Sequence, residues 1–168
     1  MQSKLKKSGI LFLITGPQGS GKTTIGKRLL PRIQTLYGKT IYCDGDILRK
    51  IFNNHDYSVE GRKKLDEPYY QFCKYIVNQQ INLIFTSVSA NWTKEQKNKE
   101  YNNFFEIYIT RSQKVRKKSK EKIFKSIKNQ KIIKSKTFDI KVINDDNKKT
   151  LDTVIKKILK KIDNTLKK

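Results

Sequence analysis

The sequence predicts an α/β fold, a three-layer sandwich in which helices cover both faces of a five-stranded, mainly parallel sheet. Short apolar runs alternate along the chain with longer stretches of helical character, a pattern typical of parallel sheets. A glycine-rich segment follows the first apolar run directly and precedes the first helical stretch. The length of 168 residues fits one domain and is too short for two ordinary ones.

The strands are expected where short apolar runs occur, at residues 9–15, 40–44, 81–87, 104–109 and 138–144. Helices are expected between and after them, at residues 22–37, 46–53, 60–79, 92–103, 111–130 and 148–166. Pro31 and Pro68 are expected to kink the first and third helices. The last helix spaces its apolar residues at three and four positions, so one stripe should pack on the sheet. The lysine-dense stretch 111–136 is a candidate lid.

The chain is strongly basic, with 38 Lys and Arg against 15 Asp and Glu and a net charge of +23. This balance raises nucleic acid or an acidic membrane surface as a partner. Only six of the basic residues are arginine, however, and arginine is the residue that base and phosphate recognition favours. The abundant Lys, Asn and Ile instead suggest the codon bias of an AT-rich genome, so we expect no specific nucleic acid partner.

Cysteine usage and hydropathy favour a cytoplasmic protein. Cys43 and Cys73 have no CxxC spacing, so the sequence indicates neither a disulfide framework nor a zinc site. No stretch approaches the roughly 20 apolar residues that span a bilayer, so we expect no membrane partner.

The segment Gly16-x-x-x-x-Gly21-Lys22-Thr23 matches the phosphate-binding loop, or P-loop, in full. Backbone N–H groups in such a loop surround phosphate oxygens, and the dipole of the following helix favours negative charge. We expect Lys22 to bridge the β- and γ-phosphates of ATP and Thr23 to bind Mg²⁺. A P-loop kinase fold with ATP and Mg²⁺ as cofactors is therefore predicted. The expected contact residues are Gly16, Gln18, Gly19, Ser20, Gly21, Lys22, Thr23 and Thr24.

A second motif, Asp44-Gly45-Asp46, comes at the carboxyl end of the second predicted strand, the edge where such sheets bind ligands. One carboxylate can orient hydrated Mg²⁺ while the other takes a proton from an attacking hydroxyl. By analogy with other small P-loop kinases we favour Asp46 as the base and Asp44 for the metal, and the sequence leaves the reverse assignment open. Lys22, Asp44 and Asp46 are the predicted catalytic residues.

Taken together, the P-loop, Asp44-Gly45-Asp46-x-x-Arg49 and Tyr57-Ser58-x-x-x-Arg62 resemble the adenylylsulfate kinase family. That family has Asp-Gly-Asp-Asn-x-Arg and Phe-Ser-x-x-x-Arg segments. Residues 86–90 are similar to its strand-end Ser-x-x-Ser, and residues 105–125 run in register with its segment ending Lys-Gly-Leu-Tyr-Lys. The resemblance covers most of the chain, with its strongest motifs early and its weakest late.

The resemblance implies a kinase that phosphorylates the ribose 3′-hydroxyl of a small nucleotide. It implies that Arg49 and Arg62 bind the phosphates of this acceptor, that Tyr57 stacks on its base and that Ser89 lies near the transferred group. The family is often dimeric, so the resemblance allows a homodimer. The implied substrate-binding residues are Asp46, Arg49, Tyr57, Arg62, Ser87, Ser89 and Phe124.

The chain lacks the family's Gly-Ile-Asp and Pro-Tyr-Glu-x-Pro stretch, which lines the nucleotide bases, since residues 131–134 pass almost directly to 138–140. This deletion is expected to change base recognition and to leave phosphoryl transfer intact. In this respect the chain resembles the cytidine diphosphoramidate kinases, the relatives of the family that serve O-methyl phosphoramidate capsule synthesis. The resemblance therefore implies cytidine diphosphoramidate as the acceptor, and adenylylsulfate is the alternative acceptor. A basic nucleic-acid-binding protein, with the P-loop as an ATPase switch, is the alternative of another class.

Overall fold

The computed structural model describes residues 8–88, 103–112, 138–145 and 148–166. Within these ranges the chain forms a five-stranded sheet in the order β2-β3-β1-β4-β5, in which every neighbouring pair is parallel. The five predicted strands are confirmed, with ends that shift by at most two residues. Their bounds are β1 (Leu11–Thr15), β2 (Thr40–Asp44), β3 (Asn82–Ser87), β4 (Phe104–Thr110) and β5 (Ile140–Ile143).

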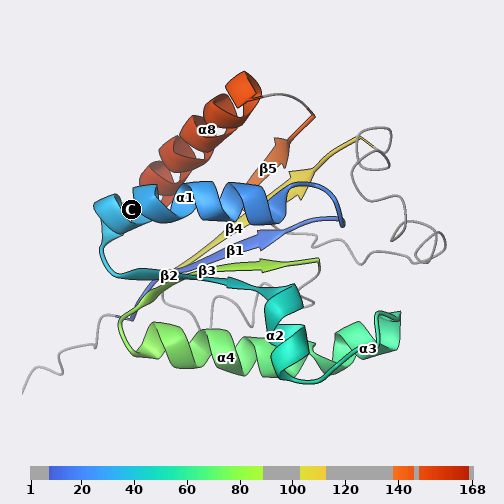
Figure 1. Cartoon of the computed structure of the whole chain (residues 1–168). Coiled ribbons are helices and arrows are strands. Elements are labelled where there is room, and N and C mark those ends of the chain that lie inside the picture. The colour runs from blue at the N-terminus through green and yellow to red at the C-terminus, as the bar shows by residue number, and fades with distance from the viewer. Residues whose placement is uncertain (1–7, 89–102, 113–137, 146–147, 167–168) are drawn as a thin grey trace, which may run out of the picture.

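Helices cover both faces of this sheet, as the sequence predicts (Figure 1). Helices α1 (Lys22–Tyr37) and α8 (Lys148–Leu166) lie on one face, and α2 (Gly45–Ile51), α3 (Val59–Lys64) and α4 (Asp66–Asn78) lie on the other. The central strand β1 is buried along its whole length because successive side chains point into the two layers in turn. Phe12 and Ile14 pack towards α1 and α8, whereas Leu11 and Leu13 pack towards α4.

The helix predicted at residues 60–79 is two helices, α3 and α4, that meet at Leu65. Ser58 caps α3 by accepting a hydrogen bond from Gly61 N–H (3.0 Å). In a continuous helix the ring of Pro68 would clash with the carbonyl of Lys64. A new helix at Asp66 places Pro68 in a first turn, where its missing N–H costs no hydrogen bond. The expected kink at Pro68 is therefore a break. Pro31, in contrast, lies within α1, which continues past it.

Several predictions of helical segments fall outside the described residues. These are the helix at 92–103, the helix at 111–130 and the candidate lid at 111–136, of which only residues 103, 111 and 112 are described, and these three residues are not helical. In the ranges that the structure does describe, no helix is long and apolar enough to cross a membrane. Cys43 and Cys73 are free thiols, as their spacing predicts.

The apolar stripe of α8 packs against α1 and β5, as its spacing predicts. Ile158 and Ile162 are fully buried in this stripe, and Val154 and Ile155 are nearly so. The last helix thus closes the hydrophobic core beside the strands that support the P-loop.

Substitution of Ile158 by alanine should lower the free energy of unfolding by about 2 to 5 kcal/mol, because it leaves a cavity in this core. Urea denaturation measures the loss. The control is Lys157→Ala at the exposed neighbouring position, which should change stability by less than about 0.5 kcal/mol. Equal effects of the two substitutions would show that α8 does not pack as described.

Candidate active site

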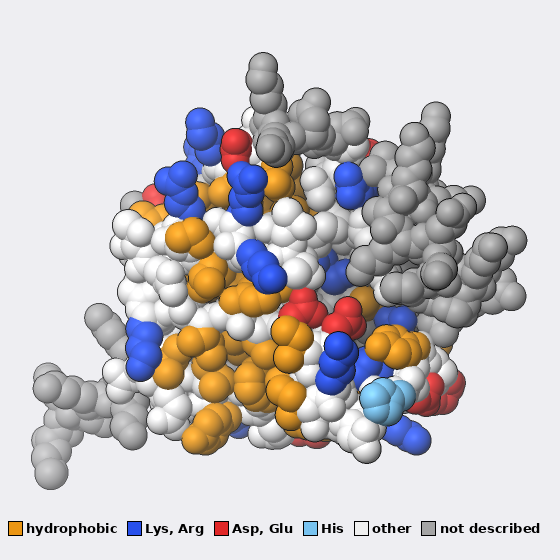
Figure 2. All heavy atoms as spheres, viewed as in Figure 1, with side chains coloured by type: hydrophobic (Ala, Val, Ile, Leu, Met, Phe, Trp, Pro, Cys, Tyr) orange, Lys and Arg blue, Asp and Glu red, His pale blue; other side chains and the backbone are white. Residues whose placement is uncertain are grey.

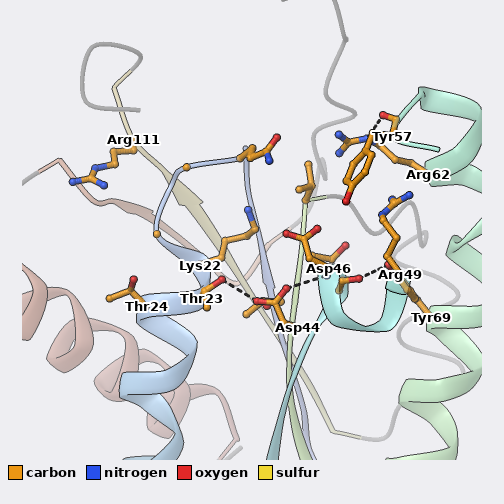
Figure 3. Close-up of a pocket in the computed structure, with 17 residues that line it drawn as sticks. Lys22, Thr23, Thr24, Asp44, Asp46, Arg49, Tyr57, Arg62, Tyr69 and Arg111 are labelled. Atoms are coloured by element: carbon orange, nitrogen blue, oxygen red, sulfur yellow. Dashed lines mark hydrogen bonds between the residues drawn. The ribbon is translucent and has the colours of Figure 1, made fainter. Parts of the chain in front are cut away.

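A cavity of about 340 Å³ opens at the carboxyl ends of the strands, the edge that the sequence singles out. The P-loop and the start of α1 form one side of it, and α2 and α3 provide the other (Figure 3). Most of the predicted site residues line this cavity. They are Gln18, Gly19, Gly21, Lys22, Thr23, Thr24, Asp44, Asp46, Arg49, Tyr57, Arg62 and Ser87. The predicted residues Ser89 and Phe124 lie outside the described ranges.

Two glycines fit the P-loop tightly to the ends of β4 and β5. A Cβ on Gly16 would collide with the carbonyl of Ile109, and one on Gly21 would collide with the side chain of Asn144. Gly21 also has φ +94°, which disfavours other residues. Asn144 donates a hydrogen bond to the Ser20 carbonyl (2.8 Å) and so fastens the loop to the sheet. The conformation of the P-loop therefore depends on its contacts with the ends of β4 and β5.

The interior of the loop has polar groups suited to a phosphate. Lys22 Nζ donates hydrogen bonds to the carbonyls of Gly16 (2.9 Å) and Pro17 (3.0 Å), so its ammonium group already lies over the loop. Ser20 Oγ and Gln18 Oε1 are buried and have no hydrogen-bond partner within the described part of the chain. A buried polar atom without a hydrogen bond lowers the stability of the fold by about 1 to 3 kcal/mol. A phosphate oxygen bound in the loop could accept a hydrogen bond from the Ser20 hydroxyl. The loop thus fits a phosphate group.

The carboxylate of Asp44 is held by donors from three elements. Its Oδ2 accepts hydrogen bonds from Thr23 Oγ1 (2.9 Å) on α1 and from Tyr42 OH (2.9 Å) on β2. Its Oδ1 accepts from the N–H of Asp46 (3.0 Å) and caps α2. Tyr42 OH also lies 3.2 Å from Thr86 Oγ1 on β3. The orientation of this carboxylate is therefore fixed before any ligand binds.

These contacts keep Asp44 ionised. Burial alone would raise its pKa, but the hydrogen bonds from Asp46, Thr23 and Tyr42 outweigh burial, and the pKa lies below its ordinary value. Burial, together with the nearby Asp44, raises the pKa of Tyr42 to about 12, so its hydroxyl stays a donor. The hydroxyl of Thr23 and the carboxylate of Asp44 are hard oxygen groups, which fit Mg²⁺. Among the described residues, no group of three or more His, Cys, Asp or Glu side chains could hold a metal ion.

Arg49 organises the loop between α2 and α3. Its side chain is only 6% exposed, and Nη1 donates hydrogen bonds to Asn54 Oδ1 (3.0 Å) and to the carbonyl of Asp56 (2.7 Å). The guanidinium lies 4.7 Å from the ring centroid of Tyr57, a cation–π contact. The family resemblance implies that Arg49 binds acceptor phosphates. In the structure this arginine also positions the loop that carries Tyr57.

Arg62 lies beside Arg49 at the same end of the cavity (Figure 3). Its Nε donates to the carbonyl of Tyr57 (3.1 Å), so it supports the same loop from α3. Burial first, and then the neighbouring charge of Arg49, lower the pKa of Arg62, while Asp46 opposes this effect. Two guanidinium groups held together in a half-buried place attract an anion, because an anion relieves their mutual repulsion.

The residues at or beside the cavity that sequence reasoning missed include Tyr42, Tyr69, Arg111 and Asn144. Tyr42 could have been found, since residues two apart on a strand share a face and Tyr42 therefore lies beside Asp44. Tyr69 donates a 2.6 Å hydrogen bond to the carbonyl of Gly45, and burial raises its pKa to about 12. The position of Tyr69 beside Gly45 depends on how α4 packs against the sheet, and no local sequence motif predicts that packing.

The sheet order, the layers and the phosphate loop define an α/β P-loop kinase fold. The chain belongs to the adenylylsulphate kinase family, whose model matches residues 8–141. A solved structure of the Mycobacterium tuberculosis APS kinase in complex with AMPPNP and APS superposes on this chain with a TM-score of 0.68. It covers 93% of this chain and 98% of that one at 16% identity, a likeness that concerns the fold.

Curated relatives carry two kinase names. A cytidine diphosphoramidate kinase of Campylobacter jejuni subsp. jejuni is 35% identical over 106 residues, which are 62% of each chain. A probable adenylyl-sulfate kinase of Pyrococcus abyssi is 28% identical over 103 residues, which are 60% of this chain and 59% of that protein. The chain therefore matches these relatives over about three fifths of their length.

Replacement of Arg49 by alanine should lower the free energy of unfolding by about 1.5 to 3 kcal/mol, since Asn54 and the Asp56 carbonyl lose a charged donor. The matched control is Lys50→Ala, the next residue of α2, which removes the same charge from an exposed position. Chemical denaturation of both variants tests the difference. If Arg49→Ala costs no more than Lys50→Ala, Arg49 does not hold the loop.

Proposed function

We propose that this protein is an ATP-dependent kinase that phosphorylates the ribose 3′-hydroxyl of a nucleoside 5′-anhydride. The observation that carries the proposal is the arrangement of one cavity, with the P-loop on one side and Arg49 and Arg62 on the other (Figure 3). Asp44 and Asp46 lie between them. This arrangement suits a phosphoryl donor and an anionic acceptor that meet at two carboxylates.

The roles of the two aspartates follow from their surroundings. Asp44 already accepts three hydrogen bonds and has a lowered pKa, so it is a poor proton acceptor. Asp46 is exposed in the cavity on the acceptor side, where it can accept the proton of the attacking hydroxyl. We therefore assign Asp46 as the base and Asp44 to metal binding, as the sequence analysis favours.

The P-loop side would stabilise the charge that develops on the transferred group. Lys22 would exchange its loop carbonyls for phosphate oxygens, and the N-terminus of α1 adds its dipole. Thr23 and Asp44 would hold Mg²⁺, which neutralises negative charge on the phosphates. Arg49 and Arg62 would bind the acceptor's phosphate chain and direct its ribose towards Asp46.

Cytidine diphosphoramidate is the acceptor we favour. The family's base-lining segment is absent from the sequence, and the relative with that name is more similar to this chain than the Pyrococcus adenylyl-sulfate kinase is. Adenylylsulfate is the second candidate, because family membership and several relatives support it. Both are 5′-anhydrides with a free 3′-hydroxyl, so the same carboxylates and arginines serve either one.

A nucleic-acid-binding role has less support. The described lysine and arginine side chains on the face shown in Figure 2 are dispersed among polar and hydrophobic side chains and do not gather into a stripe. Nucleic acid binders instead concentrate their positive charge along one surface. We further propose that the protein is located in the cytoplasm. We also propose that it forms a homodimer, because members of the family are often dimeric.

The wild-type protein should transfer phosphate from ATP to cytidine diphosphoramidate faster than to adenylylsulfate. A coupled assay of ADP release with the two acceptors side by side measures the ratio of kcat/KM values. Lys22→Ala is the matched control and should abolish turnover with either acceptor while circular dichroism stays unchanged. A preference for adenylylsulfate would overturn the choice of acceptor, and turnover retained by Lys22→Ala would overturn the P-loop assignment.

Substitution of Arg62 by alanine should raise the KM for the acceptor roughly 10- to 100-fold, since one charged hydrogen bond is lost. The dissociation constant of ADP should change less than about twofold, because Arg62 lies at the other end of the cavity from the P-loop. Lys63→Ala, an exposed neighbour in α3, controls for the charge. Weakened ADP binding by the Arg62 variant would contradict its assignment to the acceptor.

A further inference from the structure

Arg111 follows the last residue of β4, and hydrogen bonds to β5 and its following loop fix its backbone. Asn144 N–H donates to the Thr110 carbonyl (2.8 Å), and Ser112 N–H donates to Asp145 Oδ1 (2.6 Å). The pairing of β4 with β5 ends at Thr110, and these two hydrogen bonds hold the residues on both sides of Arg111. Because the hydrogen bonds of Thr110 and Ser112 fix the backbone around Arg111, the Cα atom of Arg111 has a defined position at the edge of the sheet.

The same strand ends support the P-loop. Gly16 lies against the carbonyl of Ile109, two residues before Arg111, and Asn144 bonds to the Ser20 carbonyl. A shift of the loop relative to Arg111 would therefore break the contacts that set the loop conformation. The loop and Arg111 form one prearranged unit.

The side chain of Arg111 lines the cavity on the P-loop side. Figure 3 places it near Thr24, with Lys22 and Thr23 between it and the residues Arg49 and Arg62. An anhydride acceptor bound at Arg49 and Arg62 would thus lie across the cavity from Arg111. The arginine belongs by position to the donor side, and the assigned contact residues of the P-loop do not include it.

The guanidinium of Arg111 has an unsatisfied donor. Its Nε is buried and has no hydrogen-bond partner in the part of the chain that the structure describes. Burial of a polar donor without a partner is costly, so the site fits an acceptor in the plane of the guanidinium. A phosphate oxygen meets this need, and Arg binds phosphate in this planar, forked manner. Stacking on a base would leave Nε unpaired.

We propose that Arg111 binds the α-phosphate of the donor nucleotide. Lys22 and the loop amides are assigned to the β- and γ-phosphates, and the rest of the nucleotide must leave the loop past Thr23 and Thr24, the side on which Arg111 lies. The inference rests on the proposed use of ATP as donor. It adds a positively charged contact at a point that the P-loop motif does not reach.

Direct ADP binding tests this contact. Isothermal titration of the full chain with ADP and Mg²⁺ should give a dissociation constant roughly 10- to 100-fold higher for Arg111→Gln than for the wild type. Arg111→Lys should fall between the two, because an ammonium keeps the charge and loses the fork. Arg32→Gln, an exposed arginine on α1, controls for net charge and should bind as the wild type does.

The remaining outcomes separate the two proposals. Unchanged ADP affinity in Arg111→Gln overturns the Arg111 contact, and so does a rise in the KM for the acceptor with ADP binding intact. Equal weakening by Arg111→Lys and Arg111→Gln indicates that the planar group stacks on the base, and this result also overturns the α-phosphate contact. If the wild type fails to bind ADP, the proposed donor is wrong, which is a failure of the proposed function itself.

Discussion

The carboxylate of Asp44 is the point at which the donor and acceptor sides of the site are joined. Asp44 is the last residue of β2, and its carboxylate caps α2 and accepts a hydrogen bond from the hydroxyl of Thr23 on α1. Without it, the first turn of α2 would lose its cap, and the hydroxyl assigned to the metal would lose its orientation. Three donors offset the cost of half-burying this carboxylate, which is why it remains ionised. Structure and proposed chemistry thus depend on the same oxygen atoms.

On the acceptor side, one residue serves both folding and binding. Arg49 directs one nitrogen to the loop before α3, and the same guanidinium lies over Tyr57 and close to Arg62. A loop built in this way costs little ordering entropy when a ligand arrives, because the side chains that would meet it are already placed. Burial, and then the positive charge of Arg49, lower the pKa of Arg62, which indicates that the positive charge of Arg62 is disfavoured at this position. The two neighbouring arginines, Arg49 and Arg62, lower the stability of the fold at the position where an anionic acceptor is expected to bind.

The sequence predicted the parts of the fold and site that depend on local chemistry. Strand positions, the length of α1, the P-loop and the Asp44 turn follow from apolar runs, glycine placement and residue spacing. The break at Leu65 was missed because the apolar pattern continues across it, and only the steric demand of Pro68 marks it. Arg111 and Asn144 were missed because their roles arise from the pairing of β4 with β1 and of β5 with β4, which brings together residues far apart in the sequence.

The order of the strands is also compatible with the proposed change of acceptor, in which the phosphoryl-transfer chemistry is retained. The P-loop is held by β1, β4 and β5, whereas the acceptor residues come from α2, α3 and the loop between them. Asp44 is the link, and its partners Thr23 and Tyr42 lie in α1 and β2. Loss of the family's base-lining segment before β5, which the sequence analysis predicts, would therefore remove contacts to bases and leave the phosphate-binding groups in place. We therefore expect that the base can change with the two carboxylates and the arginines unchanged, because the hydrogen bonds described for them come from α1, β2, α2 and the loop before α3.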